Sequence, residues 1–321
     1  MQPRPPSTDA PLTVRLAEPR GFCAGVDRAI RIVEEALAAR GAPVYVRHEI
    51  VHNAHVVERL RAMGAVFVDD VADAPSDRPI VFSAHGAPKS AYDAATARGM
   101  DPIDATCPLV LKIHNEARRH VRDGRHVLLI GHAGHPEIVG VMGQVPDGAA
   151  SLVETPADAE AVSPPQGPLA YATQTTLSVD DAAEIIATLT RRFPDIAAPR
   201  TADICYATTN RQCAVKAAAA GCDAFFVVGD PTSSNSKRLV ETAARAGADR
   251  AALIDDPAAF DAREVDGAAV IGVSAGASAP EDLVEAFVAR LAASRAIRIE
   301  RVCVAEERVT FKSPPIAALA R

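Results

Sequence analysis

The sequence contains no tryptophan, and aromatic residues make up only 4% of its 321 residues. Proteins that bind single-stranded nucleic acids stack the bases on aromatic side chains, so we do not expect such a surface here. The formal net charge is −7, so no overall positive field attracts nucleic acid either. If a phosphate ligand binds this chain, local hydrogen-bond donors must hold it against a net negative protein.

The sequence also lacks an apolar run of about 20 residues, which a transmembrane helix requires. Residues 1–11 (MQPRPPSTDAP) lack the apolar core of a signal peptide, and their proline content predicts a disordered tail. We therefore expect a cytoplasmic protein with no membrane partner. Hydrophobic residues make up 48% and charged residues 23% of the chain, which is typical of a globular protein.

No CxxC pair occurs in the sequence, which excludes a zinc ribbon and a local ferredoxin loop. No GxGxxG motif follows a predicted strand, so the chain carries no flavin or nicotinamide fingerprint. In a reducing compartment we expect no disulfides among the six cysteines, which are Cys23, Cys107, Cys205, Cys213, Cys222 and Cys303.

Short apolar runs alternate with amphipathic helical stretches along the chain. Most of the runs lack strict alternation, which is typical of strands buried on both faces of a parallel sheet. The predicted strands lie at residues 44–46, 80–82, 127–130, 169–172, 224–228, 251–254 and 268–273. Helices are predicted over residues 27–40, 108–123, 178–193 and 237–246. This alternation predicts an α/β fold with mainly parallel sheets.

Three cysteines, each of which precedes a predicted helix, recur at a coarse spacing: Cys23, Cys107 and Cys205. Three pseudo-similar α/β modules of about 90 residues, with one cysteine each, would account for this spacing. We therefore expect domains over residues 12–103, 104–200 and 201–295, with a tail at 1–11 and a C-terminal tail at 296–321.

These three cysteines have polar neighbours and adjoin glycine or proline, which favours a metal-binding role. Thiolates hold iron–sulfur clusters, usually four to a cluster, so three ligands would leave one iron open to a substrate oxygen. The alternative is that the cysteines are buried core residues, as cysteines often are. That alternative is the favoured interpretation of Cys213, Cys222 and Cys303.

Small and polar residues follow the predicted strands, at the edge where open parallel sheets bind ligands. Three histidines are in this position, namely His52, His85 and His135. An imidazole donates hydrogen bonds to phosphate oxygens, and the recurrence favours a shared anion site over three solvated loop residues. We expect structural or surface roles for the other six histidines: His48, His55, His114, His120, His126 and His132.

Hydroxyl and amide side chains gather after another predicted strand, in the run from Ser233 to Ser236 that includes Ser234 and Asn235. They either donate to an anion or cap the helix that follows. Ser278 follows the strand predicted at residues 268–273 and is also compatible with a capping box, because a glutamate lies three residues further on.

Two residues are candidates for proton transfer. Glu137 lies two residues after His135, and a carboxyl beside an anion and a cluster has a raised pKa, which suits a proton donor. The alternative is a first-turn glutamate that stabilises its helix dipole. Thr175 follows a predicted strand and could hold a substrate hydroxyl and relay a proton.

Taken together, nine motifs resemble the 4-hydroxy-3-methylbut-2-enyl diphosphate reductase family, which catalyses the last step of the non-mevalonate isoprenoid pathway. They occur in register over nearly the whole chain, from about residue 12 to 295. The motifs are RGFCAGV (20–26), EIVHN (49–53), FSAHG (82–86), DATCPLV (104–110), GHAGHPE (131–137), TQTTLS (173–178), ICYATTNRQ (204–212), SSNS (233–236) and AGASAP (275–280).

The resemblance implies a trefoil-like arrangement of three α/β domains around a central [4Fe–4S] cluster held by Cys23, Cys107 and Cys205. It implies that the substrate diphosphate is bound by His52, His85, His135, Ser233, Ser234, Asn235 and Ser278. It also implies that Glu137 is the proton donor, that Thr175 lies beside it at the substrate hydroxyl, and that ferredoxin or flavodoxin supplies the electrons. The products would be isopentenyl and dimethylallyl diphosphate.

Two other functions use part of the same set of residues. A metal-dependent phosphohydrolase would place zinc or manganese on the three histidines and Glu137, but it leaves the three well-placed cysteines without a role. An iron–sulfur sensor that binds a phosphorylated ligand would use the cysteines, but it leaves Glu137 and Thr175 without one. The reductase accounts for all of these residues.

Overall fold

The computed structural model describes residues 11–316, so the tail expected at residues 1–11 lies almost entirely outside the described residues. The chain divides into two compact units. The first consists of the described residues up to Cys23 together with Tyr206–Val309, and the second of Ala24–Cys205 together with the described residues from Thr310 onward. No helix within residues 11–316 is long and apolar enough to cross a membrane.

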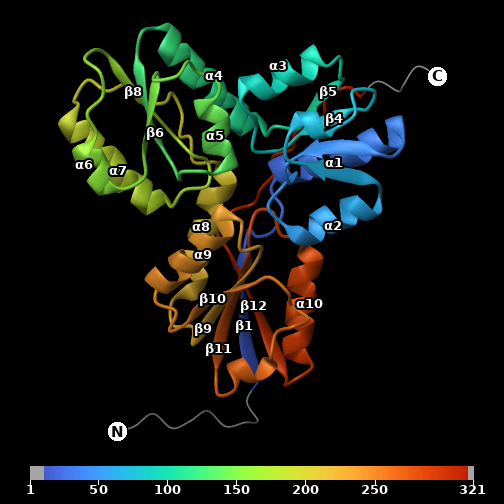
Figure 1. The fold of residues 1–321 in the computed structure, drawn as a ribbon. Coiled ribbons are helices and arrows are strands. Elements are labelled where there is room, and N and C mark those ends of the chain that lie inside the picture. The colour runs from blue at the N-terminus through green and yellow to red at the C-terminus, as the bar shows by residue number, and fades with distance from the viewer. Residues whose placement is uncertain (1–10, 317–321) are drawn as a thin grey trace. The chain divides into compact units, whose positions relative to one another are not determined.

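The first unit is built on a parallel sheet with the strand order β10-β9-β11-β1-β12. Figure 1 shows β1, in blue, among the orange and red strands from the C-terminal part of the chain. The strands are β1 (Leu12–Glu18), β9 (Ala224–Val228), β10 (Ala251–Ile254), β11 (Val270–Ala275) and β12 (Ile297–Cys303). The helices are α8 (Tyr206–Ala219), α9 (Ser234–Arg245), α10 (Glu281–Ala292) and the short 3₁₀ helix η2 (Ala262–Val265).

Apolar side chains on both faces of this sheet are buried, as the uninterrupted apolar runs predict. Phe226 of β9 packs edge-on against two other rings, with centroid distances of 5.2 Å to Phe260 and 5.4 Å to Phe287. On the opposite face, Phe225 lies in a cluster with the alanine-rich side of α8. The strands β1, β9 and β11 of the sheet are therefore buried between these two clusters.

The second unit contains two parallel sheets, with the orders β3-β2-β4-β5 and β7-β6-β8. The strands are β2 (Val44–Arg47), β3 (Ala65–Val68), β4 (Ile80–Phe82), β5 (Pro102–Asp104), β6 (His126–Ile130), β7 (Ala150–Val153) and β8 (Leu169–Thr173). The helices are α1 (Ala24–Arg40), α2 (Ala54–Ala62), α3 (Lys89–Ala97), α4 (Pro108–Arg122), α5 (Pro136–Met142), α6 (Pro156–Ala161), α7 (Val179–Arg192) and the 3₁₀ helix η1 (Val71–Asp73).

Local capping explains where several of these helices begin. Asn53 accepts a hydrogen bond from the N–H of Val56 at the start of α2. Thr155 and Asp158 form a complete capping box at the start of α6. Ser178 caps α7, so this helix starts one residue after the predicted position.

The three sheets repeat one topology, and this confirms the prediction of three similar α/β modules with parallel sheets. Each sheet contains three neighbouring strands in which the earliest in sequence is central, the next lies on one side and the last on the other: β3-β2-β4, β7-β6-β8 and β10-β9-β11. A helix follows the central strand each time, namely α2, α5 and α9. The predicted division of the chain into domains stays a prediction.

Sheet membership departs from the expected domain limits at both ends of the chain. β1 was expected in the module at residues 12–103, but it pairs with β11 and β12. β12 lies within the expected tail at 296–321, where it adds an edge strand. Most of β1 is buried, so its backbone N–H and C=O groups need hydrogen-bond partners within the protein. β11 and β12 supply these partners, one on each side.

Candidate functional site

The second unit brings three predicted histidines together. The ring centroids of His52 and His85 lie 4.2 Å apart, and His135 lies 5.7 Å from His52 and 6.0 Å from His85. Each ring is half-buried, so part of each is accessible to a ligand. This cluster confirms that the three strand-end histidines lie together, although their binding of an anion stays a prediction.

Strand topology explains the cluster. β2 and β4 are parallel neighbours, so the segments that follow them leave from the same edge of their sheet. His85 lies three residues beyond the end of β4, and His52 lies five residues beyond the end of β2. His135 lies five residues beyond the end of β6 and is the N-cap of α5.

The imidazoles of His135 and His52 have different hydrogen-bond partners. The Nδ1 atom of His135 accepts a hydrogen bond of 3.2 Å from the N–H of Glu137, so a neutral ring carries its proton on Nε2 and can donate it. Nδ1 of His52 lies 3.2 Å from the carboxylate of Glu49 and donates to it. His52 then donates from Nε2 only in its charged form.

Burial lowers the pKa of two histidines in the cluster and so favours their neutral form. Burial, together with a smaller contribution from the neighbouring His52, lowers the pKa of His135 to about 3. Burial also holds the pKa of His85 well below its ordinary value, again with a contribution from His52. An anion among these rings would reverse both effects, because an opposite charge favours the protonated imidazole.

Glu137 and Thr175 form a buried pair next to this cluster. Only 2% of Glu137 and 5% of Thr175 are exposed. Thr175 donates twice, from its N–H to Oε1 of Glu137 at 2.6 Å and from its hydroxyl to Oε2 at 2.7 Å. Burial nevertheless raises the pKa of Glu137 to about 7, although the two hydrogen bonds act in the opposite direction. A carboxyl with this pKa exchanges protons near neutral pH, as a general acid must.

In the first unit, the predicted serine and asparagine residues follow β9 and β11. Ser233 caps α9 by accepting from the N–H of Ser236, so α9 begins three residues before the predicted start. The neighbouring Asn235 is only 4% exposed, and neither its amide nitrogen nor its amide oxygen has a hydrogen-bond partner among the described residues. Buried polar atoms without partners are rare in proteins, so this amide has hydrogen-bonding capacity that no described residue uses.

Ser278 is also buried, and the capping interpretation of it is wrong. α10 begins at Glu281, and its N-cap is Pro280, which makes no side-chain cap. Ser278 lies in the loop after β11, close in sequence to the buried Ser274, whose hydroxyl has no partner among the described residues. The loop after β11 therefore resembles the loop after β9 in holding buried polar side chains.

None of the six cysteines, all of which lie within residues 11–316, forms a disulfide, and they fall into two groups. Cys23, Cys107 and Cys205 are half-buried, and each comes directly before a helix: α1, α4 and α8. Among the others, only Cys222 is buried, so the expectation of a core position is wrong for Cys213 and Cys303, which are exposed. Cys213 lies on the outside of α8 and Cys303 ends the edge strand β12, where a thiol has no core to enter.

The backbone around these three thiols repeats like the sheets. The N–H of Cys107 donates to the carbonyl of Ala84, that of Cys205 to Thr175, and that of Cys23 to Ala277. Each acceptor lies two residues beyond the end of the third strand of a module: β4, β8 and β11. Accessible thiols at helix N-termini are suitable donors for iron, so the donor set fits an iron–sulfur cluster.

Within residues 11–316, no three His, Cys, Asp or Glu side chains form a group able to hold a metal ion. Cys23 belongs to the first unit, whereas Cys107 and Cys205 belong to the second. The predicted set of three cluster ligands therefore stays a prediction.

Sequence reasoning missed one supporting residue, Asp203. Its carboxylate accepts the N–H of Thr173, at the end of β8, and it also binds Lys112. The available signal was the placement of aspartates shortly before cysteines, because Asp104 likewise accepts from the N–H and the hydroxyl of Thr106 just ahead of Cys107.

The fold and these side chains define a three-module parallel α/β protein with a histidine cluster, a buried acid and thiols at helix N-termini. Residues 14–292 match the family described as "LytB protein", and the chain belongs to that family. This confirms the resemblance that the motifs indicate.

Several curated relatives of this chain carry the name "4-hydroxy-3-methylbut-2-enyl diphosphate reductase". The protein of Phenylobacterium zucineum is 60% identical over 305 residues, which cover 95% of this chain and 97% of the relative. The protein of Hyphomonas neptunium is 57% identical over 313 residues, which cover 97% of this chain and 99% of the relative.

A solved structure has the same fold. The "E-1-hydroxy-2-methyl-but-2-enyl-4-diphosphate reductase from Plasmodium falciparum" superposes with a TM-score of 0.91 at 36% identity, and the match covers 95% of this chain and 96% of that one. The α/β fold class predicted from the sequence is thereby confirmed.

Proposed function

We propose that this chain is a 4-hydroxy-3-methylbut-2-enyl diphosphate reductase. It would remove the allylic hydroxyl of its substrate with two electrons and two protons, and release water with isopentenyl or dimethylallyl diphosphate. The observation that carries the proposal is the buried Glu137–Thr175 pair, whose acid is joined through its backbone to the histidine cluster. The names of the curated relatives support the same reaction.

The diphosphate is assigned first to the histidine cluster. His135 donates from Nε2 in its neutral form, and His85 gains a donor when the anion favours its protonation. Binding energy from this remote group holds the substrate in place, so that its reacting end is oriented without further cost.

The first unit supplies the other donors that we assign to the diphosphate, namely Ser233, Ser234, Asn235 and Ser278. The unpartnered amide of Asn235 supports this assignment, because a phosphate oxygen and its hydration can satisfy a buried amide. The buried hydroxyl of Ser274, which lies near the end of β11 and has no partner among the described residues, supports it in the same way.

Glu137 is assigned as the acid that protonates the departing hydroxyl. Burial raises its pKa to about 7, so the protonated carboxyl is accessible near neutral pH. Thr175 orients the carboxyl through two hydrogen bonds, and its own hydroxyl can pass a proton between substrate and acid. Because both side chains are buried, bulk water does not compete for that proton.

We assign Cys23, Cys107 and Cys205 as the ligands of a [4Fe–4S] cluster. When bound, such a cluster supplies the two electrons singly and, with only three thiolates, an iron that acts as a Lewis acid. The electrons would come from ferredoxin or flavodoxin, and we place the enzyme in the cytoplasm, where such donors are found.

The test is anaerobic turnover with a reduced viologen as the electron donor. We expect isopentenyl and dimethylallyl diphosphate as products, together with iron and acid-labile sulfide bound to the protein. Release of inorganic phosphate without either product would favour the phosphohydrolase. A fully loaded cluster without turnover would favour a sensor.

A further inference from the structure

Each cysteine assigned to the cluster is followed by a helix that carries a cation near its start. Arg28 lies five residues after Cys23 on α1, Lys112 five residues after Cys107 on α4, and Arg211 six residues after Cys205 on α8. None of these cations has a role in the reaction as derived above. Each of them binds backbone carbonyls just ahead of a different cysteine.

Lys112 holds the segment ahead of Cys205. Its ammonium donates to the carbonyls of Thr201 and Ala202 at 2.8 and 3.0 Å, and to Oδ1 of Asp203 at 3.0 Å. The side chain of Asp203 is fully buried, and its other oxygen is fixed by the N–H of Thr173. The segment is thereby tied both to α4 and to the end of β8.

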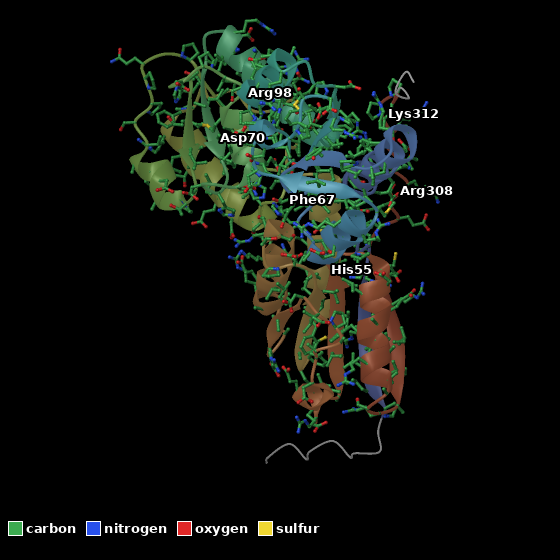
Figure 2. All side chains as sticks on the ribbon, turned by 45° about the vertical axis from the view of Figure 1, so that its right-hand side comes forward. His55, Phe67, Asp70, Arg98, Arg308 and Lys312 are labelled. Carbon is green, nitrogen blue, oxygen red and sulfur yellow. The ribbon has the colours of Figure 1, made fainter. Side chains whose placement is uncertain are left out.

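Arg28 holds the segment ahead of Cys107. One guanidinium nitrogen donates to the carbonyls of Ala105 and Thr106 at 3.3 and 3.0 Å. Its Nε donates to the carbonyl of Lys312 at 2.8 Å, in the C-terminal part of the same unit (Figure 2). Arg28 is buried, so these bonds are shielded from competing water.

Arg211 holds the segment ahead of Cys23 in the first unit. Its guanidinium donates to the carbonyl of Gly21 at 3.0 and 2.7 Å and to that of Phe22 at 3.2 Å. The carboxylate of Glu307 pairs with it at 2.9 Å. Arg211 is fully buried, so its charge must be compensated, and these partners do so.

The topology gives the reason for this pattern. Each cysteine lies where the chain leaves one module, and the helix after it packs on another: α1 on β2, α4 on β6 and β8, and α8 on β1 and β11. The cation on each helix therefore lies beside the exit segment of the module that its own helix covers. The order is cyclic. The cation on α1 binds the segment ahead of Cys107, the cation on α4 binds the segment ahead of Cys205, and the cation on α8 binds the segment ahead of Cys23.

We propose that Arg28, Lys112 and Arg211 are positioning residues, one for each thiol that holds the cluster. A cation that binds the carbonyls directly ahead of a cysteine fixes the peptide planes from which the side chain projects. Residues that support metal ligands in this way commonly change metal affinity by about 10- to 100-fold when they are replaced. This inference rests on the proposed function, because it presumes the cluster.

Lys112 offers the clearest test, because its side chain is partly exposed and its loss should not unfold the protein. The anaerobically loaded enzyme is compared in three forms: wild type, Lys112→Met and Lys112→Arg. Iron and sulfide per chain are measured, together with the rate at which iron passes to a chelator. Lys112→Met should lose iron about tenfold faster, and Lys112→Arg should restore the wild-type rate in large part.

The matched control is Arg98→Met in the same unit (Figure 2). Arg98 also donates to a backbone carbonyl, that of Ala74 at 2.7 Å, but it contacts no segment ahead of a cysteine. Its replacement should leave iron release unchanged, even if it lowers the melting temperature as much as Lys112→Met does. In the first unit, Arg211→Met is compared with Arg295→Met, whose native side chain binds the carbonyl of Ala268. Arg211→Lys replaces Arg211→Met if that variant does not fold.

The outcomes separate the two proposals. If the wild-type protein takes up no cluster, the proposed function fails and the positioning role falls with it. If the wild type loads and turns over, but Lys112→Met releases iron no faster than Arg98→Met does, only the positioning role is overturned. Faster release in Lys112→Met with rescue by Lys112→Arg supports it.

Discussion

The Thr175 hydroxyl donates to Oε2 of Glu137 at 2.7 Å while the Thr175 N–H donates to Oε1 at 2.6 Å, so one residue holds both oxygens of a buried acid. These two hydrogen bonds fix the plane of the carboxyl group and leave few orientations for its proton. Since burial raises the pKa of Glu137 to about 7, the pair combines a fixed geometry with a usable proton.

Replacing Glu137 with glutamine should preserve substrate binding and remove most turnover. Glutamine keeps the shape and an acceptor for the Thr175 N–H, but it has no acidic proton to deliver. We expect kcat to fall by about 10²- to 10⁴-fold with substrate affinity nearly unchanged, as measured by anaerobic kinetics and binding titration. Near-normal turnover would mean that Glu137 serves only its helix.

The Thr175 hydroxyl should affect the rate through the acid. Thr175→Val keeps the shape and removes the bond to Oε2, whereas Thr175→Ser keeps that bond and serves as the control. Loss of the bond raises the pKa of Glu137 further, because the bond now lowers it. We expect kcat to be about tenfold lower in Thr175→Val. We also expect the alkaline decrease of kcat in this variant to occur at a higher pH than in the wild type. An identical pH profile in the two variants would contradict this role.

Glu137 should also make stability depend on pH. Its pKa rises from 4.5 to about 7 on folding, so between these values the folded protein binds more protons than the unfolded one. Its contribution to the free energy of unfolding is therefore full below this window and is lost as pH rises through it. Relative to Glu137→Gln, the free energy of unfolding of the wild type should decrease by about 3 kcal/mol between pH 4 and pH 8. This decrease is measured as a lower melting temperature. A constant difference across pH would contradict the raised pKa.

Diphosphate binding should take up protons. His85 has a lowered pKa, and an anion raises it, so affinity should increase as pH is lowered from 8 to 6. Calorimetry in buffers of different ionisation enthalpy measures the uptake. His135→Asn keeps a good helix cap but loses the neutral Nε2 donor, so it should bind at least tenfold more weakly. Equal affinity in the variant and the wild type would remove His135 from the assignment.

Sequence patterns predicted the sheets better than their connections. The strands at 80–82, 224–228 and 251–254 have the predicted bounds, because uninterrupted apolar runs leave little choice of structure. The pairing of β1 with β11 and β12 is a contact between the two ends of the chain, and no local pattern reports it. A short strand such as β5 carries too little apolar sequence to be recognised.

Some residues of the candidate site could likewise be predicted from the sequence, and others could not. Histidines, serines and cysteines after strands could be identified because their types are unusual there and because their motifs resemble a known family. Lys112 and Arg28 could not, since a lysine or arginine on a helix is usually a solvated surface residue. Their function depends on which carbonyls they meet, and those carbonyls lie about 80 or 90 residues away in sequence.

The most direct test of the account is the iron content of Cys107→Ser, measured beside Cys213→Ser as the matched control. Cys213 is an exposed thiol on α8 to which the account gives no ligand role. After anaerobic loading, Cys213→Ser should bind iron and sulfide and turn over as the wild type does, whereas Cys107→Ser should hold little cluster and show almost no turnover. Full iron content with normal turnover in Cys107→Ser would contradict the assignment of the thiols, and with it the mechanism.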